Sequence, residues 1–154
     1  MHMHRTMFDR YDEAAMRALF FARSSLTEHG GTCIDPEHLL IGLLAAHPQA
    51  VLAFASAPAD LEDLRERLIA MIAGETRLPE TEEVAMSSES LAAIEHAQIE
   101  ADDLSSARIR PEHLILGILA KTAGPAAAAV RRVGVDPSAV RRALASERPA
   151  GGGG

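Results

Sequence analysis

Aromatic residues are scarce in this sequence. They make up 3% of its 154 residues and include no tryptophan, although 47% of the residues are hydrophobic. Any core must therefore be built from Leu, Ile, Val, Ala and Met, a composition that suits closely packed helices. Alanine is used heavily and is the best helix former. A chain of this length corresponds to about one domain and can bury a working core without disulfides.

Cysteine is also scarce, and basic stripes and long apolar runs are missing. Cys33 is the only cysteine, so no intrachain disulfide can form, which fits a reducing cytoplasm. No apolar run approaches the roughly 20 residues that span a bilayer, and the polar start does not resemble a signal peptide. The formal net charge of −7 argues against a nucleic-acid partner. We therefore expect a soluble, cytoplasmic monomer that binds neither nucleic acid nor membrane.

The chain contains two copies of one unit. The segment 34–45 returns without a gap as 109–120, a shift of 75 residues, and both copies contain the sequence Pro-Glu-His. After this motif the second copy has one extra residue, so that Asp60 aligns with Asp136 at a shift of 76. Each copy is too small for a comfortable core of its own. We expect the two copies to pack on each other with approximate two-fold symmetry.

Each copy predicts four helices, and no segment alternates with a period of two for long enough to predict a strand. The predicted helices cover residues 12–28, 36–46, 49–56 and 60–74 in the first copy, and 87–104, 111–121, 125–132 and 136–146 in the second. The expected fold is all-α, with two tandem four-helix repeats related by a pseudo-two-fold axis. The expected organisation is a disordered start (1–6), repeat 1 (7–74), a linker (75–86), repeat 2 (87–146) and a flexible glycine-rich tail (147–154).

These residues resemble a known family. The order Met7-Phe8-x-x-Tyr11, a cap at Asp12, a helix ending in glycine, and a duplicated Ile-x-x-Glu-His-Leu motif is similar to the amino-terminal domain of bacterial Clp-type ATPases, closest to the ClpC branch. The resemblance covers about residues 7–146. It implies a domain without catalysis of its own that docks adaptors and substrates for an ATP-driven unfoldase ring. The sequence has no Gly-x-x-x-x-Gly-Lys-[Ser/Thr] phosphate loop, so we expect a stand-alone module without the ATPase, or a piece of one.

Glu37 and Glu112 are the sharpest candidates for a binding site. The resemblance implies that they line two symmetry-related pockets for phosphorylated arginine. A carboxylate can take a guanidinium-type group through paired hydrogen bonds, and a helix start attracts phosphate. Alternatively, acidic residues simply favour the first turn of a helix. Pro36 and Pro111 stand where the family usually has threonine, and proline lacks the hydroxyl and the N–H that would serve a phosphate.

The other motif residues have structural interpretations. His38 and His113 lack the further ligands that a metal site needs, so we expect partly buried histidines, each hydrogen-bonded within its own repeat. Gly42 and Gly117 lie inside predicted helices, where glycine costs about 1 kcal/mol relative to alanine. Close helix–helix approach would offset that cost. Since the histidines lack further ligands and the glycines have a packing role, we expect no metal and no cofactor.

A peptide groove is the remaining candidate site. The resemblance implies that Phe8, together with an aromatic position that is Met86 here, lines a groove that holds peptides and cyclic-peptide antibiotics. Glu95 matches an acidic position of that groove, and Tyr11 lies beside Phe8 ahead of the first helix. The alternative is that Phe8 and Tyr11 only fasten the start of the helix to the core.

Basic residues of ClpC-type relatives are replaced here by Met16 and Leu91, so the groove should be more apolar. Three functions follow. The first is a non-catalytic module of the Clp proteolysis system, which binds substrates, adaptors, phosphoarginine-marked proteins, the Clp ATPase or cyclic peptides, and either delivers cargo or competes as a decoy. The second is a regulatory protein-interaction domain unrelated to proteolysis. The third is a small enzyme that uses the Glu–His pairs, although we find no catalytic constellation.

Overall fold

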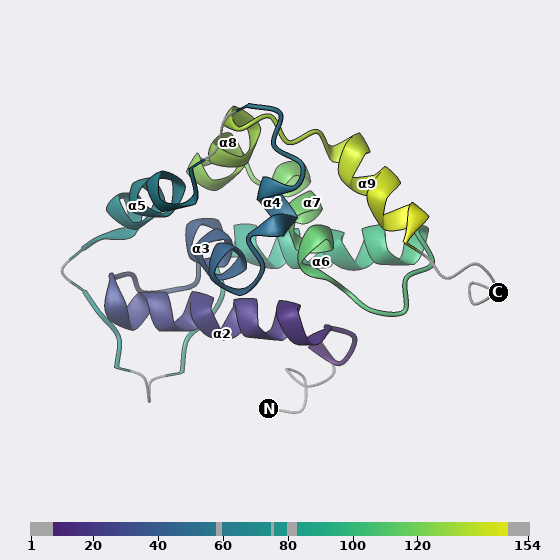
Figure 1. The fold of residues 1–154 in the computed structure, drawn as a ribbon. Coiled ribbons are helices and arrows are strands. Elements are labelled where there is room, and N and C mark those ends of the chain that lie inside the picture. The colour runs from purple at the N-terminus through teal and green to yellow at the C-terminus, as the bar shows by residue number, and fades with distance from the viewer. Residues whose placement is uncertain (1–7, 58–59, 75, 80–82, 148–154) are drawn as a thin grey trace.

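The computed structural model describes residues 8–57, 60–74, 76–79 and 83–147. These residues form eight helices and no strand, as the sequence predicts (Figure 1). In chain order the helices are α2 (Glu13–Glu28), α3 (Pro36–Ala46), α4 (Gln49–Leu52), α5 (Leu61–Ile72), α6 (Ser88–Asp103), α7 (Pro111–Lys121), α8 (Pro125–Arg132) and α9 (Pro137–Ser146).

Seven of the predicted helices agree with the observed bounds to within two residues, and α4 is the exception. The sequence predicts a helix to residue 56, but α4 ends at Leu52. The backbone N–H groups of Ser56 and Ala57 donate instead to the carbonyl of Val133, over 3.0 and 3.1 Å. Val133 follows α8 in the second copy, so a contact between the copies takes the N–H groups that a helix reaching residue 56 would use.

The predicted start (1–6) and most of the predicted tail (147–154) lie outside the described residues. Glu147 is described, and it is the C-cap residue of α9 and an ion-pair partner of Arg110. The described part of the predicted linker runs along α2. Thr27 Oγ1 donates to the carbonyl of Leu78 over 2.6 Å, and Arg23 Nη2 donates to that of Pro79 over 2.6 Å.

Two matching backbone contacts show the pseudo-two-fold relation. Tyr11, just before α2, forms an isolated parallel bridge with Ile109, and Met86, just before α6, forms one with Ile34. In the first, the N–H of the residue after Tyr11 donates to the Ile109 carbonyl over 3.0 Å. In the second, the N–H of the residue after Met86 donates to the Ile34 carbonyl, also over 3.0 Å. Each repeat therefore begins by pairing with the loop that precedes the motif helix of the other.

The two glycines allow the first two helices of each repeat to approach very closely. A Cβ atom at Gly42 on α3 would overlap the carbonyl oxygen of Ala18 on α2 and lie 2.8 Å from Ala22 N. A Cβ atom at Gly117 on α7 would overlap the carbonyl oxygen of Ala93 on α6. This is the close approach that the sequence predicts, and in both cases the partner helix belongs to the same repeat.

The helices α3 and α7 form the centre of the molecule. Every residue of α7 from Pro111 to Leu119 is buried, as are most residues of α3, which fits their apolar composition on all sides. Figure 1 shows α2 along one side of them and α5, α8 and α9 along the opposite side. Contacts between α2 and α7 and between α3 and α6 join the repeats. No single helix within the described ranges is long and apolar enough to cross a membrane, although α7 and α8 together, bent by 112°, pass by length and composition alone.

Candidate functional site

The two motif glutamates face the short helices of the opposite repeat. Glu37 lies in the first turn of α3, and its Oε2 accepts a hydrogen bond from Ala126 N over 3.2 Å at the start of α8. Glu112 holds the equivalent position on α7 and is 7% exposed, with its Oε2 3.3 Å from Nε2 of His47 just before α4. Both carboxylates thus contribute to the contact between the repeats.

One carboxylate oxygen of Glu112 has no hydrogen bond within the described part of the chain. Glu112 Oε1 is fully covered and has no hydrogen-bond partner among the described residues. Nε of Arg110 lies 3.7 Å from this oxygen, and the guanidinium of Arg110 also pairs with Glu147. The two motif glutamates therefore differ, since Glu37 accepts a backbone hydrogen bond from a helix start while Glu112 lies between a histidine and an arginine.

Both motif histidines close the first turn of their helix. Nδ1 of His38 accepts a hydrogen bond from the backbone N–H of Asp35 over 3.0 Å. Nδ1 of His113 accepts one from the backbone N–H of Arg110 over 2.9 Å. Both rings are fully buried, more than the sequence predicts. Nε2 of His38 lies 3.0 Å from the carbonyl of Gly30, whereas Nε2 of His113 has no partner in the described parts of the chain. Burial lowers the pKa of His113 to about 4, so its ring is neutral at pH 7.

The two motif prolines, Pro36 and Pro111, occupy the first position of their helices and are buried. This position needs no N–H donor, because the first N–H groups of a helix have no partner inside it. No cluster of three or more histidine, cysteine, aspartate or glutamate side chains arranged to hold a metal ion occurs in the described ranges.

The aromatic residues before α2 pack on each other. The rings of Phe8 and Tyr11 meet edge to face with centroids 5.0 Å apart. Tyr11 is 5% exposed, and burial raises the pKa of its hydroxyl, which has no hydrogen-bond partner among the described residues. Phe8 and Met86 are partly buried against the core. These side chains fasten the starts of α2 and α6, and Phe8 and Met86 remain partly open to a ligand.

One exposed side chain was not identified from the sequence. Phe20 on α2 is 66% exposed, and Met16, one turn earlier on the same face, is 43% exposed. We call this pair the α2 apolar face. The equivalent residues of α6 are Leu91, which is half-buried, and Glu95, which is exposed. Phe20 lies outside the buried stripe of α2, so an aromatic residue on the solvent side was the available signal.

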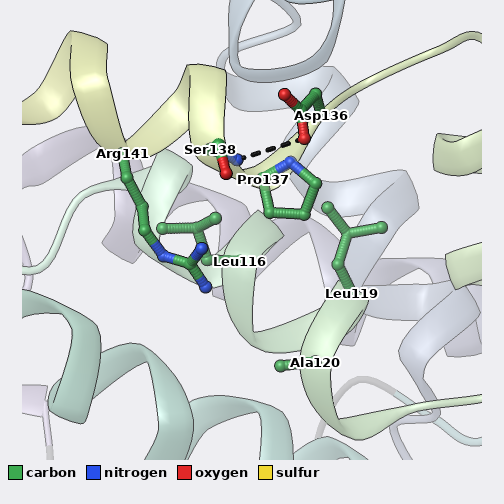
Figure 2. Close-up of a pocket in the computed structure, with 7 residues that line it drawn as sticks. All are labelled: Leu116, Leu119, Ala120, Asp136, Pro137, Ser138 and Arg141. Carbon is green, nitrogen blue, oxygen red and sulfur yellow. Dashed lines mark hydrogen bonds between the residues drawn. The ribbon is translucent and has the colours of Figure 1, made fainter.

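A pocket of about 240 Å³ lies between α7 and α9 (Figure 2). It is lined by Leu116, Leu119, Ala120, Asp136, Pro137, Ser138 and Arg141. Arg141 extends from α9 toward Leu116 in this view, and its guanidinium is held by Glu100 of α6. Hydrogen bonding from Arg141 lowers the pKa of Glu100 despite the opposing effect of burial. None of the predicted site residues lines this pocket.

Comparison with known proteins identifies the family. The sequence matches the Clp repeat (R) N-terminal domain over residues 10–119 and 85–151. The chloroplastic chaperone ClpC of Pisum sativum is 28% identical over 141 residues, which cover 89% of this chain and 15% of that protein. ClpB of Oceanobacillus iheyensis is 26% identical over 137 residues, covering 88% and 17%. This chain therefore spans about a sixth of the length of these relatives.

The fold agrees with a solved structure of the same kind. The N-terminal domain of ClpD from Arabidopsis thaliana superimposes with a TM-score of 0.67 at 23% identity, covering 90% of this chain and 94% of that one. The duplicated motif, the paired starts of α2 and α6 and the sequence match together show that this chain belongs to the Clp repeat N-terminal domain family.

Proposed function

We propose that this chain is a non-catalytic docking module of the Clp proteolysis system, which binds apolar segments of substrates or adaptors on the α2 apolar face. The proposal rests on the exposure of the Phe20 side chain. A phenylalanine that is 66% exposed is removed from water when a partner covers it. At about 25 cal/mol per Å² of apolar surface, its burial contributes roughly 2–3 kcal/mol before the cost of association.

The two repeats offer different surfaces to a ligand. Repeat 1 presents Met16 and Phe20, whereas the equivalent face of repeat 2 carries Leu91 and Glu95. Methionine adapts to irregular apolar partners. The carboxylate of Glu95 would lose its hydration if an apolar segment covered it, which is unfavourable. We therefore expect one apolar segment to bind per chain, although the fold contains two repeats.

Phosphoarginine binding at the motif glutamates is a second candidate. The covered Oε1 of Glu112, which lacks a hydrogen bond, favours a cationic group. Against it, Glu37 already accepts a hydrogen bond from Ala126, and Glu112 already has a histidine and an arginine beside it. A phosphoarginine-marked protein would have to replace these contacts with its own in order to bind. We therefore place the α2 apolar face first and the glutamates second.

The proposal is tested by fluorescence anisotropy with labelled, unstructured apolar peptides. Phe20→Ser should weaken binding at least tenfold, and Met71→Ser, at a residue of α5 that is 48% exposed, should leave it unchanged. Circular dichroism of both variants checks that the fold is intact. Absence of binding by the unaltered protein, or an equal loss in both variants, would refute the assignment.

A Clp degradation assay separates delivery from competition. Addition of the protein should accelerate degradation of a bound substrate if it delivers cargo, and slow it if it acts as a decoy. Titration with free phosphoarginine and with a cyclic-peptide inhibitor tests the other ligands.

We also propose residues 7–74 and 87–146 as the two repeats. We propose that the protein is a monomer, which sedimentation equilibrium would test, and that it is located in the cytoplasm.

A further inference from the structure

Repeat 2 contains a half-buried ion pair that joins its first and last helices. Arg141 of α9 donates from Nε to Glu100 Oε1 over 3.0 Å and from Nη2 to Glu100 Oε2 over 2.8 Å. Glu100 belongs to α6, is 5% exposed, and has His96 Nε2 2.9 Å from its Oε2. This two-bond geometry is the one in which arginine recognises carboxylates most strongly.

Repeat 1 keeps the arginine but not the carboxylate. The alignment of the two copies equates Arg141 with Arg65 of α5 at the shift of 76, and Glu100 with Ser25 of α2 at the shift of 75. Ser25 is 2% exposed, and its hydroxyl donates to a carbonyl of its own helix. The position of His96 is taken by Phe21. Repeat 1 therefore has no charged group at either place that holds the guanidinium in repeat 2.

Arg65 has neither a hydrogen bond nor an ion pair to any described residue. Its Nε is fully covered and without a partner, while its Nη atoms are not among the covered, unpartnered atoms, so the outer edge of the guanidinium remains accessible. The neighbouring Arg67 is already paired with Asp63 over 2.9 Å, and Glu62, one turn before Arg65, is exposed. A covered donor on a charged group destabilises the fold until an acceptor reaches it.

We propose that Arg65 is a carboxylate-binding residue, which receives an acidic side chain of a docked protein segment as Arg141 receives Glu100 in repeat 2. Arginine suits this role because its planar fork matches a carboxylate and keeps its charge at every working pH. The lack of a partner for the guanidinium among the described residues does not depend on the function of the chain. Only the source of the carboxylate rests on the proposed docking function.

Nuclear magnetic resonance of the arginine Nε–Hε groups tests the proposal directly. The probes are an end-blocked apolar peptide with one glutamate, the same peptide with glutamine, and acetate. The glutamate peptide should shift the Arg65 resonance to saturation at a tenth of the acetate concentration or less, and the glutamine peptide should not shift it. Arg141 should not respond, because Glu100 holds it. Equal responses to the two peptides, or to acetate and the glutamate peptide, would overturn the proposal.

Matched variants separate this site from general charge effects. Arg65→Gln should weaken binding of the glutamate peptide at least fivefold, whereas Arg67→Gln, the same charge change on the same helix, should not. Ser25→Glu places a carboxylate where repeat 2 has one, so the Arg65 resonance should move toward that of Arg141 and stop responding. If Ser25→Glu does not fold, the comparison of Arg65→Gln with Arg67→Gln decides, and equal affinities would refute the site.

Two outcomes with the unaltered protein distinguish this inference from the proposed function. If the unaltered protein binds no apolar peptide while Arg65 still responds to acetate, docking fails and the guanidinium site remains without its proposed protein source. If peptides bind to the α2 apolar face while Arg65 responds to no carboxylate, docking stands and the present inference is wrong.

Discussion

Replacing Gly42 with alanine should destabilise this fold, although alanine is the better helix former by about 1 kcal/mol. The added Cβ atom would overlap the carbonyl oxygen of Ala18 and lie 2.8 Å from Ala22 N. Both are backbone atoms of α2, so no side-chain rotation relieves the overlap and the two helices must move apart. Overpacking of a well-packed core costs about 1–3 kcal/mol, and this case belongs at the upper end. We expect a net loss of about 2 kcal/mol.

Urea unfolding followed by circular dichroism measures this loss. With a slope of about 2 kcal/mol per M, the midpoint should fall by roughly 1 M. Gly117→Ala should behave in the same way, because its Cβ atom would overlap the carbonyl oxygen of Ala93. Gly74→Ala is the control, since its Cβ atom would meet only the carbonyl oxygen of Ile72 at 3.8 Å, and its stability should change by less than about 0.5 kcal/mol. An unchanged or higher midpoint for either helix variant would refute the close-approach argument.

Three further predictions concern charged groups. Because burial lowers the pKa of His113 to about 4 from an ordinary 6.5, its contribution to stability is complete above pH 6.5 and is lost as the pH falls toward 4; urea midpoints measured across that range should show this. Arg141→Gln should cost about 1–2 kcal/mol, and the pKa of Glu100, followed by NMR titration, should rise toward its usual value. Glu37→Ala should cost about 1 kcal/mol because Ala126 N loses its acceptor, and Glu37→Gln should cost less; equal midpoints for both would contradict the capping role.

The helices could be predicted well because their signals are local. Pro36 and Pro111 mark two helix starts, and Asp60 accepts a hydrogen bond from the first turn of α5. The helix that was predicted too long, α4, ends at Leu52, and Ser56, where the prediction ended it, bonds to the carbonyl of Val133. That contact joins residues 77 positions apart, and no local pattern indicates it. A prediction from local patterns fails where the second repeat supplies the hydrogen-bond partner.

The candidate site could be predicted only in part. The sequence places Glu37 and Glu112 at helix starts, but their partners belong to the opposite repeat and are set by how the repeats pack. Helical periodicity predicts which residues form the buried stripe of a helix. Phe20 lies outside the stripe of α2, so periodicity gives no signal for its exposure.

The duplication itself provides a way to separate fold from function. Gly42 and Gly117 are the same in both copies and make the same close contact in both, so the fold alone accounts for them. Positions that differ need another reason. Ser25 and Glu100 occupy equivalent places, yet only one of them neutralises an arginine. Phe20 is exposed where the other copy has a carboxylate. Since one backbone accommodates either residue, the fold alone does not dictate these differences, and they are the positions at which binding is best tested.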